Sequence, residues 1–237
     1  MEYLILDWDT DFFGVKVAKI LIPNLSLEQL RNVLSDLDRE NVKLVYWPAD
    51  KEVSLDVIQS INGQLVDRRT SFEINLQNLN PSHYALSDLI EKYEASMDAS
   101  ELEKLAIQSG EYSRFSVDQN IGREKFEALY KSWIRKSLSK EIADEVFVIR
   151  DKGSIAGMVT LGNKNGKGSI DLLAVDVQYR GKKYGETLVR AAQGWFIKNG
   201  YEMGVVVTQK NNIPACNLYK KNGYSVSSVE YFYHFYL

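Results

Sequence analysis

Apolar residues recur along the first part of the chain at spacings that alternate between those of strands and helices. Residues 15–22 alternate well enough for a strand, and the apolar run 42–47 predicts a second strand that ends at Pro48. Between them, a capping box precedes apolar residues at helical spacing: Ser26 and Gln29, then Leu27, Leu30, Val33, Leu34 and Leu37. A helix at 55–61 and a strand at 64–76 complete a small α/β domain, which we expect over residues 1–80.

The turn-rich segment 78–83 (NLNPSH) predicts a linker, so we expect a second domain over residues 84–237. Its pattern indicates a strand, two helices, a meander of three strands, a helix, a strand, a helix and a final aromatic strand. The expected ranges are 86–93, 99–108, 123–138, 145–150, 155–161, 169–175, 184–198, 203–208, 213–221 and 224–236. This order predicts an α/β fold with a mixed, partly antiparallel sheet flanked by helices.

The segment from Ser169 to Phe196 carries the most informative pattern in the chain. A hydrophobic strand ends at Val175, and Arg180-Gly181-Lys182-Lys183-Tyr184-Gly185 then leads directly into a helix. The backbone N–H groups of such a turn point outward, and the helix N-terminus adds partial positive charge, which together favour phosphate binding. A strand, turn and helix with two glycines also occurs without any ligand, and the spacing leaves both interpretations open.

This segment resembles the acetyl-CoA motif of the GNAT superfamily of N-acetyltransferases, an Arg/Gln-x-x-Gly-x-Gly/Ala pattern after a strand. Arg180 and Gly185 match the motif, whereas Lys183 stands at its middle glycine. The amides can still hold a pyrophosphate if Lys183 begins the helix without a positive φ. The resemblance implies acetyl-CoA as cosubstrate, with residues 180–185 on its pyrophosphate. It also implies that backbone groups of Leu173 and Val175 hold the pantetheine arm, and that an amide near Val175 polarises the thioester carbonyl.

The helix expected at 213–221 carries a second motif. Asn211 or Asn212 can cap this helix, and the pattern Asn-x-x-Ala-x-x-Leu-Tyr-x-x-x-Gly-Tyr, which begins at Asn212, resembles the last GNAT helix. The resemblance implies that Asn212 borders the cofactor site and that Tyr219 protonates the departing thiolate. A phenol of pKa ~10 can donate to a thiolate whose acid has a pKa of ~8.5. In an arbitrary helix Tyr219 would be a half-buried core residue, and we interpret Cys216 as a small apolar contact rather than a nucleophile.

An acceptor amine must lose a proton when it attacks a thioester, and a carboxylate is the usual agent. Asp171 is a candidate because it lies in the strand before the phosphate segment. Strand alternation predicts that it shares a face with Leu173 and Val175. A carboxylate at the rim of the strand, with no catalytic role, is the alternative.

Two short segments resemble the bacterial dTDP-fucosamine acetyltransferase family: Asp11-Phe12-Phe13-Gly14 and Glu111-Tyr112-Ser113-Arg114-Phe115. The resemblance implies an acceptor amine on a nucleotide-linked amino-deoxy sugar. Phe12 or Phe13 would stack on a thymine or sugar face, Gly14 would permit close approach of the backbone, and Arg114 would fork onto a diphosphate. Alternatively, the two phenylalanines belong to the core and Arg114 pairs with an acid such as Glu111.

Composition limits the remaining classes of function. The net charge of -3 argues against a broad nucleic-acid surface, and the chain lacks the ~20 consecutive apolar residues of a membrane span. The acidic N-terminus is not a signal peptide, the single cysteine suits a reducing compartment, and no metal-ligand spacing occurs, so we expect a cytoplasmic enzyme without a metal. A homodimer is a further expectation, because residues 231–236 are apolar on both faces.

Two other functions stay open at this point. The clustered acids Asp7, Asp9 and Asp11 would suit another acceptor amine, namely a polyamine, an aminoglycoside or a protein N-terminus. The lysine at the middle-glycine position would suit a module that binds acetyl-CoA without catalysis.

Overall fold

The computed structural model describes residues 2–84 and 86–237, which form two compact units. The first unit comprises Met1–Thr70 with Val229–Leu237, and the second comprises Ser71–Ser228. The division falls inside two long strands, β4 (Gly63–Asn75) and β10 (Ser225–Tyr236), so each strand contributes to both units. The sequence predicts a domain boundary at the turn-rich segment 78–83, whereas a strand shared by two units carries no turn signal.

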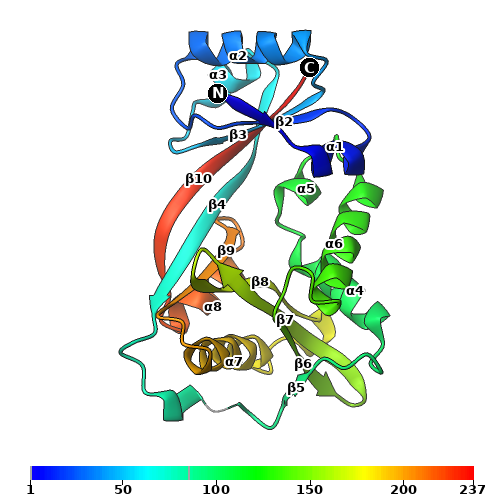
Figure 1. Cartoon of the computed structure of the whole chain (residues 1–237), viewed down its shortest axis with the longest axis vertical. Helices are drawn as coiled ribbons and strands as arrows, with labels where there is room; N and C mark the ends of the chain where they lie inside the picture. Colours follow the sequence, from blue (N-terminus) through cyan, green and yellow to red (C-terminus); the bar gives the residue numbers. More distant parts are fainter. Residues whose placement is uncertain (1, 85) are drawn as a thin grey trace. The chain divides into compact units, whose positions relative to one another are not determined.

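The first unit places a helix over a mixed sheet (Figure 1). Its elements are β1 (Tyr3–Ile5), α1 (Asp7–Phe13), β2 (Val17–Ile20), α2 (Leu27–Arg39), β3 (Leu44–Ala49) and α3 (Leu55–Gln59), with parts of β4 and β10. The strands follow the order β1-β2-β3-β10-β4, and β2 and β3 are parallel. Helix α2 buries four of the five side chains that the helical spacing predicted, and Leu27 is only partly buried; the four are Leu30, Val33, Leu34 and Leu37. The predicted capping box is present, with Gln29 N donating to Ser26 Oγ at 3.2 Å.

Two local features of this unit differ from the expectation. Strand β3 does not end at Pro48, which instead pairs with Phe232 of β10. The proline is tolerated because β2 pairs with β3 only as far as Tyr46, so no partner there needs its missing N–H. A short helix, α1, was not predicted, and it ends at Gly14, whose φ of 70° is left-handed.

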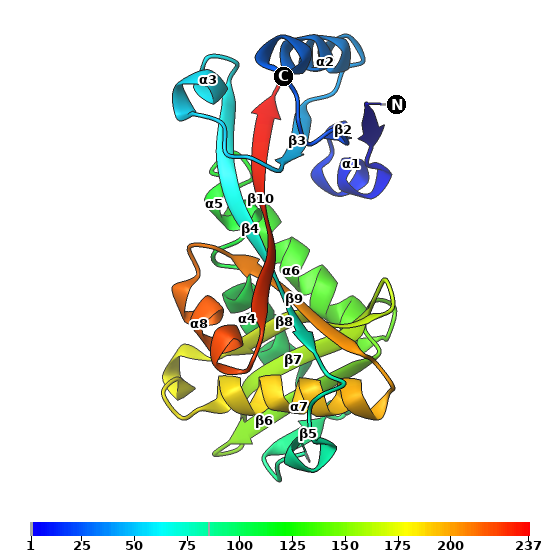
Figure 2. The same cartoon turned by 90° about the vertical axis from the view of Figure 1, so that its left-hand side faces the viewer.

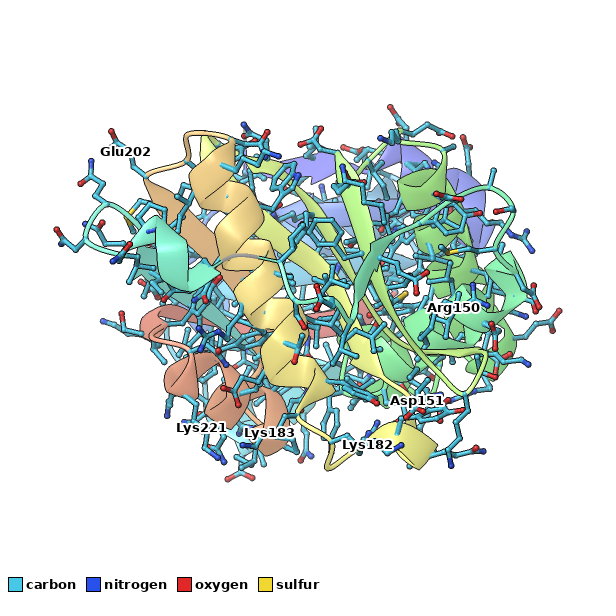
Figure 3. The ribbon with its side chains drawn as sticks, turned by 90° about the horizontal axis from the view of Figure 1, so that it is seen from below. Arg150, Asp151, Lys182, Lys183, Glu202 and Lys221 are labelled. Atoms are coloured by element: carbon cyan, nitrogen blue, oxygen red, sulfur yellow. The ribbon has the colours of Figure 1, made fainter. Side chains whose placement is uncertain are left out.

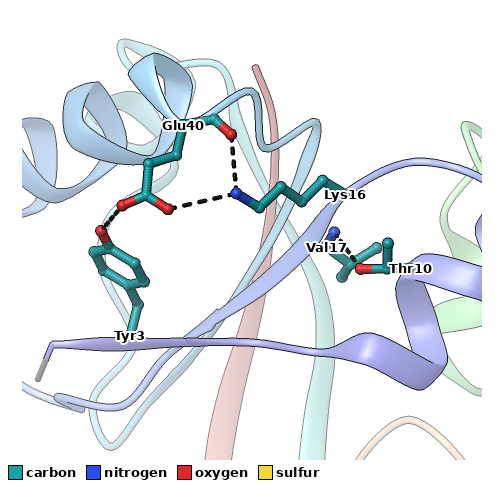
Figure 4. Close-up of polar contacts among 5 residues, drawn as sticks. All are labelled: Tyr3, Thr10, Lys16, Val17 and Glu40. Atoms are coloured by element: carbon teal, nitrogen blue, oxygen red, sulfur yellow. Dashed lines mark hydrogen bonds and ion pairs between the residues drawn. The ribbon is translucent and has the colours of Figure 1, made fainter.

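Polar contacts tie the start of the chain to the end of α2 (Figure 4). Glu40 accepts a hydrogen bond from the Tyr3 hydroxyl, and Lys16 Nζ donates to the Glu40 carbonyl at 3.0 Å. The bond from Tyr3, followed by that from Lys16, holds the pKa of the Glu40 carboxyl below its usual value. Next to them, Val17 N donates to Thr10 Oγ1 at 3.0 Å and joins α1 to β2.

The second unit contains a sheet with helices on both faces. Its elements are β5 (Ile90–Lys92), α4 (Ala99–Ser109), α5 (Arg114–Val117), α6 (Arg123–Leu138), β6 (Glu145–Asp151), β7 (Ser154–Lys164), β8 (Lys167–Val175), α7 (Tyr184–Lys198), β9 (Met203–Gln209) and α8 (Ile213–Lys221). The strand order is β10-β4-β9-β8-β7-β6-β5, and β8 and β9 are parallel. Helix α7 packs on one face of the β6, β7 and β8 strands, and α4 packs on the other face of β7 and β8 (Figure 2). The mixed, partly antiparallel sheet flanked by helices is confirmed.

Most element bounds of this unit agree with the hydrophobic periodicity, including those of α6, α7 and α8. The strand expected at 86–93 is only three residues long, because β5 pairs with β6 over Ile90–Lys92 alone. Among the residues that the structure describes, no helix combines the length and the apolarity needed to cross a membrane.

Strands β8 and β9 pair over a short stretch only. Gly168 to Ile170 face Gly204 to Val206, and within the described residues no further pairing joins the two strands. The end of β8, up to Val175, therefore has one edge that the sheet leaves unused. The candidate site lies at this end.

Candidate functional site

A pocket of about 600 Å³ opens in the second unit where β8 ends and where α7 and α8 begin. Three stretches of chain form most of its wall: the end of β8, the loop into α7, and one face of α8. The lining residues from these stretches are Leu173, Ala174, Val175, Arg180, Gly181, Lys183, Tyr184, Gly185, Glu186, Asn212, Pro214, Ala215, Asn217, Leu218 and Lys221. The structure thus brings together most of the residues expected to bind the cofactor.

The loop into α7 presents unused backbone donors. Asp176 shapes its first turn, because Gln178 N donates to Asp176 Oδ1 at 2.9 Å. Within the described residues, no hydrogen bond uses an amide from Arg180 to Glu186, and the first bond into the helix runs from Thr187 N to Lys183 O at 3.0 Å. Four of these amides lie in the loop and three in the first turn of α7, and unused donors at a helix N-terminus are the groups that an anion site requires.

Lys183 does not begin the helix in the expected conformation. Its φ of 63° and ψ of 11° are left-handed, so the condition of a helix start without positive φ is not met. The backbone keeps the geometry that the motif's middle glycine would allow, although a side chain in this region costs roughly 1–2 kcal/mol. Lys183 is among the residues that line the pocket.

The three cations of the loop have different surroundings. Arg180 Nε donates to Val175 O at 3.2 Å, which holds its guanidinium at the end of β8. Lys182 does not line the pocket; it forms an ion pair with Asp151 at the end of β6. Figure 3 shows Lys182 beside Asp151, with Lys183 on the other side of the start of α7. Arg180 and Lys183 are therefore the two residues of this loop that bring positive charge to the pocket lining.

The end of β8 lines the pocket as expected, because Leu173 and Val175 both contact it. Asp171, however, is the extra residue of a β-bulge. Leu172 pairs with Thr160 and Ile170 pairs with Leu161, which leaves Asp171 without a partner in the register.

The bulge changes which side chains share a face. Ile170 and Leu173 lie three residues apart, yet both pack against the core cluster under α7. Asp171 instead lies with Ser169, because Asp171 Oδ2 and Ser169 Oγ are both close to the Cα of Gly162 in the neighbouring strand. The expectation that Asp171 shares a face with Leu173 and Val175 is wrong, and Asp171 is not among the residues that line the pocket.

Helix α8 turns its two motif residues in different directions. Asn212 caps the helix, with Ala215 N donating to its Oδ1 at 3.2 Å, and it lines the pocket. Tyr219 is 4% exposed and lies on the core side, 5.8 Å from the Phe72 ring and 6.0 Å from the Tyr224 ring. Burial raises the pKa of the Tyr219 phenol well above its usual value. The structure does not place this residue among those that line the pocket.

Cys216 lies in the core beside Tyr219 and is 8% exposed. Its thiol donates to Gln209 O at 3.5 Å, and burial raises its pKa. A thiol in this state is a poor nucleophile, which agrees with its interpretation as an apolar contact.

The residues expected to bind an acceptor have local structural roles. In the first unit, Phe13 is buried, Phe12 stacks on Trp8 at 5.2 Å, and Gly14 ends α1. In the second unit, the Arg114 guanidinium lies 4.3 Å from the centroid of the Phe115 ring. The pocket itself is built from the second unit alone.

The remaining part of the pocket wall includes Glu111 and Tyr112, the first two residues of the segment 111–115 whose resemblance implies an acceptor site. Gln108, Ser109, Glu111 and Tyr112, at and after the end of α4, line the pocket opposite α8. Gln108 Nε2 donates to Asp176 Oδ2 at 2.9 Å, which links α4 to the phosphate loop. No local pattern marks a helix end as a ligand wall, because the fold alone brings it to β8.

Comparisons with known proteins agree with this arrangement. Residues 110–224 match the model of the Acetyltransferase (GNAT) family. The chain is 32% identical over 80 residues to "Streptothricin acetyltransferase" from Escherichia coli, a match that covers 33% of this chain and 45% of that protein. It is 30% identical over 86 residues to "Uncharacterized N-acetyltransferase YobR" from Bacillus subtilis, covering 36% and 35%. The matches thus span less than half of either relative.

Among solved structures, the GCN5-related N-acetyltransferase from Sphaerobacter thermophilus has a TM-score of 0.65 at 14% sequence identity. The likeness covers 98% of this chain and 75% of that one. The expected GNAT fold is confirmed, and the match of residues 110–224 includes the pocket loop and α8.

Proposed function

We propose that this chain, whose residues 110–224 form an acetyltransferase domain of the GNAT family, is an acetyl-CoA-dependent N-acetyltransferase. The observation that carries the proposal is the run of seven amides without hydrogen bonds, Arg180–Glu186, at the mouth of a pocket of about 600 Å³. Such amides bind a pyrophosphate at a helix N-terminus, and the pocket accepts a long, partly apolar arm.

The residues present fit this cosubstrate, which supplies an acetyl group activated as a thioester. The loop amides bind the pyrophosphate, and Arg180 and Lys183 add positive charge beside it. The free edge of β8 at Leu173 and Val175 offers backbone groups to the pantetheine arm. Tyr184 and Gly185 also line this part of the pocket. A Cβ atom at position 185 would crowd the side chain of Leu218, so a glycine fits here.

We assign acetyl transfer to direct attack of the amine in a ternary complex. The chain's cysteine is buried with a raised pKa, so the pocket offers no thiolate for an acyl-enzyme step. The resemblance implies that Tyr219 protonates the departing sulfur; this residue is 4% exposed and lies outside the pocket lining, so its role is decided by the turnover of Tyr219→Phe. Sequential rather than ping-pong steady-state kinetics is the expected behaviour.

The proposed acceptor is the amino group of a nucleotide-linked amino-deoxy sugar. This finer proposal is supported by the residues 11–14 and 111–115, which resemble the dTDP-fucosamine acetyltransferase family. A second candidate acceptor is another small amine, because one relative is named "Streptothricin acetyltransferase".

The experiment is thiol release from acetyl-CoA with a panel of amines that includes dTDP-linked 4-amino-4,6-dideoxyhexoses, polyamines, aminoglycosides and streptothricin. Rapid release with a dTDP-amino sugar alone supports both parts of the proposal. Release with the other amines only keeps the reaction and discards the sugar. Binding of CoA without release with any amine favours a non-catalytic module.

A further inference from the structure

The phosphate loop has few internal restraints on its shape. Its amides from Arg180 to Glu186 make no hydrogen bonds within the described residues, and Lys183 holds a left-handed backbone that disfavours a side chain. Strained backbone of this kind persists only where surrounding groups hold it. The residues on either side of Lys183 show what holds it.

Both neighbours of Lys183 bind the same carboxylate. Tyr184 Oη donates to Asp151 Oδ2 at 2.8 Å, and Lys182 Nζ forms an ion pair with the same oxygen. The Asp151 side chain is 14% exposed and its contact with Tyr184 is partly buried, whereas the Lys182 side chain is 44% exposed. Figure 3 shows Asp151 and Lys182 together at the start of α7.

The position of Asp151 is itself fixed by a tight hairpin. Asp151 pairs with Ser154 across Lys152-Gly153, and these two turn residues have φ values of 54° and 88°. Two positive φ values in a two-residue loop are typical of a type I′ turn, which sets the register of β6 and β7. The hairpin thereby presents the carboxylate at one place beside the loop.

We propose that Asp151 is a positioning residue that holds the strained phosphate loop in its anion-binding shape through Lys182 and Tyr184. This proposal rests on the proposed function, because the anion is the pyrophosphate of acetyl-CoA. Asp151 lies outside the pocket lining and acts through its two partners.

Electrostatics alone gives the opposite expectation for removal of the carboxylate. Asp151→Asn would remove a negative charge near the loop and leave the Lys182 cation uncompensated, which favours an anion. A positioning role predicts weaker binding, because the loop must be ordered when the ligand binds. The sign of the change in CoA affinity of Asp151→Asn therefore separates the electrostatic effect from the positioning effect.

The test is calorimetric titration of CoA into the wild type, Asp151→Asn, Tyr184→Phe and the double variant. Glu202→Gln is the matched control, since it removes one carboxylate of the same unit at an exposed site remote from Asp151 in Figure 3. We expect at least a fivefold loss of affinity for Asp151→Asn and a smaller loss for Tyr184→Phe. The double variant should lose no more than Asp151→Asn, because the two residues act through one contact. Unchanged or tighter CoA binding by Asp151→Asn overturns the proposal.

A second readout uses the ligand-free protein and does not depend on the proposed function. Hydrogen exchange at the Thr187 amide reports the first bond into α7, which leads directly from Lys183. Exchange there should be faster in Asp151→Asn and in Tyr184→Phe, and the same as the wild type in Glu202→Gln. If the wild type binds no CoA, the proposed function fails, and this exchange alone decides whether Asp151 orders the loop. Equal exchange in all variants overturns the positioning role.

Discussion

The backbone amide of Leu172 donates to the hydroxyl oxygen of Thr160 at 2.9 Å. This bond lies at the bulge that removes Asp171 from the register of β7 and β8. Thr160 is fully buried, so no water can replace its oxygen. In a regular antiparallel ladder the Leu172 amide would donate to a backbone carbonyl, whereas here it donates to a side-chain hydroxyl. The bulge therefore depends on this one threonine.

Thr160→Val should destabilise the protein by roughly 1–3 kcal/mol, because it leaves a buried amide without a partner at nearly unchanged volume. Urea unfolding measures this change. Thr160→Ser, which keeps the hydroxyl, is the matched control and should lose less. Equal losses for the two variants would show that the methyl group, not the hydrogen bond, matters.

Lys183→Gly should separate stability from cosubstrate binding. Glycine removes the left-handed strain and should raise the free energy of unfolding by about 0.5–1 kcal/mol. The loss of the cation should weaken CoA binding about two- to fivefold. Lys183→Ala removes the same charge but keeps the strain, so it should show the weaker binding without the gain in stability. Thermal unfolding and CoA titration of both variants check this, and a less stable Lys183→Gly would contradict it.

Tyr219→Phe removes one oxygen and keeps the ring between Phe72 and Tyr224. If the phenol donates to the departing sulfur, kcat should fall by about 10²–10⁴ while the affinity for CoA stays the same. A plot of wild-type kcat against pH should show no fall from deprotonation of Tyr219 up to at least pH 10, because burial raises the pKa of the phenol. A variant with wild-type kcat would leave Tyr219 with only its packing role.

The Asp171 carboxyl should lower the free energy of unfolding as the pH rises. Desolvation raises the pKa of its carboxyl, and Ser169 partly offsets this effect, but the residue is exposed, so its contribution to stability is small. A carboxylic acid whose pKa is raised in the folded state does not change the free energy of unfolding at a pH where it is protonated in both the folded and the unfolded state. It destabilises the fold once the pH passes its unfolded-state pKa, about 3.9. Asp171→Asn should therefore match the wild type near pH 3 and gain melting temperature relative to it above pH 5. A gain that is largest at low pH would contradict this sign.

The repeated helical and strand periods were sufficient to predict the fold around the site. The bounds of α7 and α8 follow from their apolar faces and from the cap at Asn212, and these are local properties. The cradle residues were also predictable, because a strand, a turn and a helix place them next to one another in sequence.

Other features could not be read from local pattern. Alternation assumes a regular ladder, so the bulge at Asp171 placed its side chain on the unexpected face. The left-handed backbone of Lys183 depends on its neighbours' contacts with Asp151, about thirty residues earlier in the chain. Likewise, the wall that contains Glu111 exists only because α4 packs on β8.

The central claim is that the amides of Arg180–Glu186 bind the pyrophosphate of acetyl-CoA. The most direct measurement is amide nitrogen–proton NMR of the isotope-labelled protein during titration with CoA. The account predicts that the largest shift changes occur at these seven amides, which have no hydrogen-bond partner within the described residues before the ligand binds. Absence of binding, or changes centred elsewhere with this loop unaffected, would contradict the account.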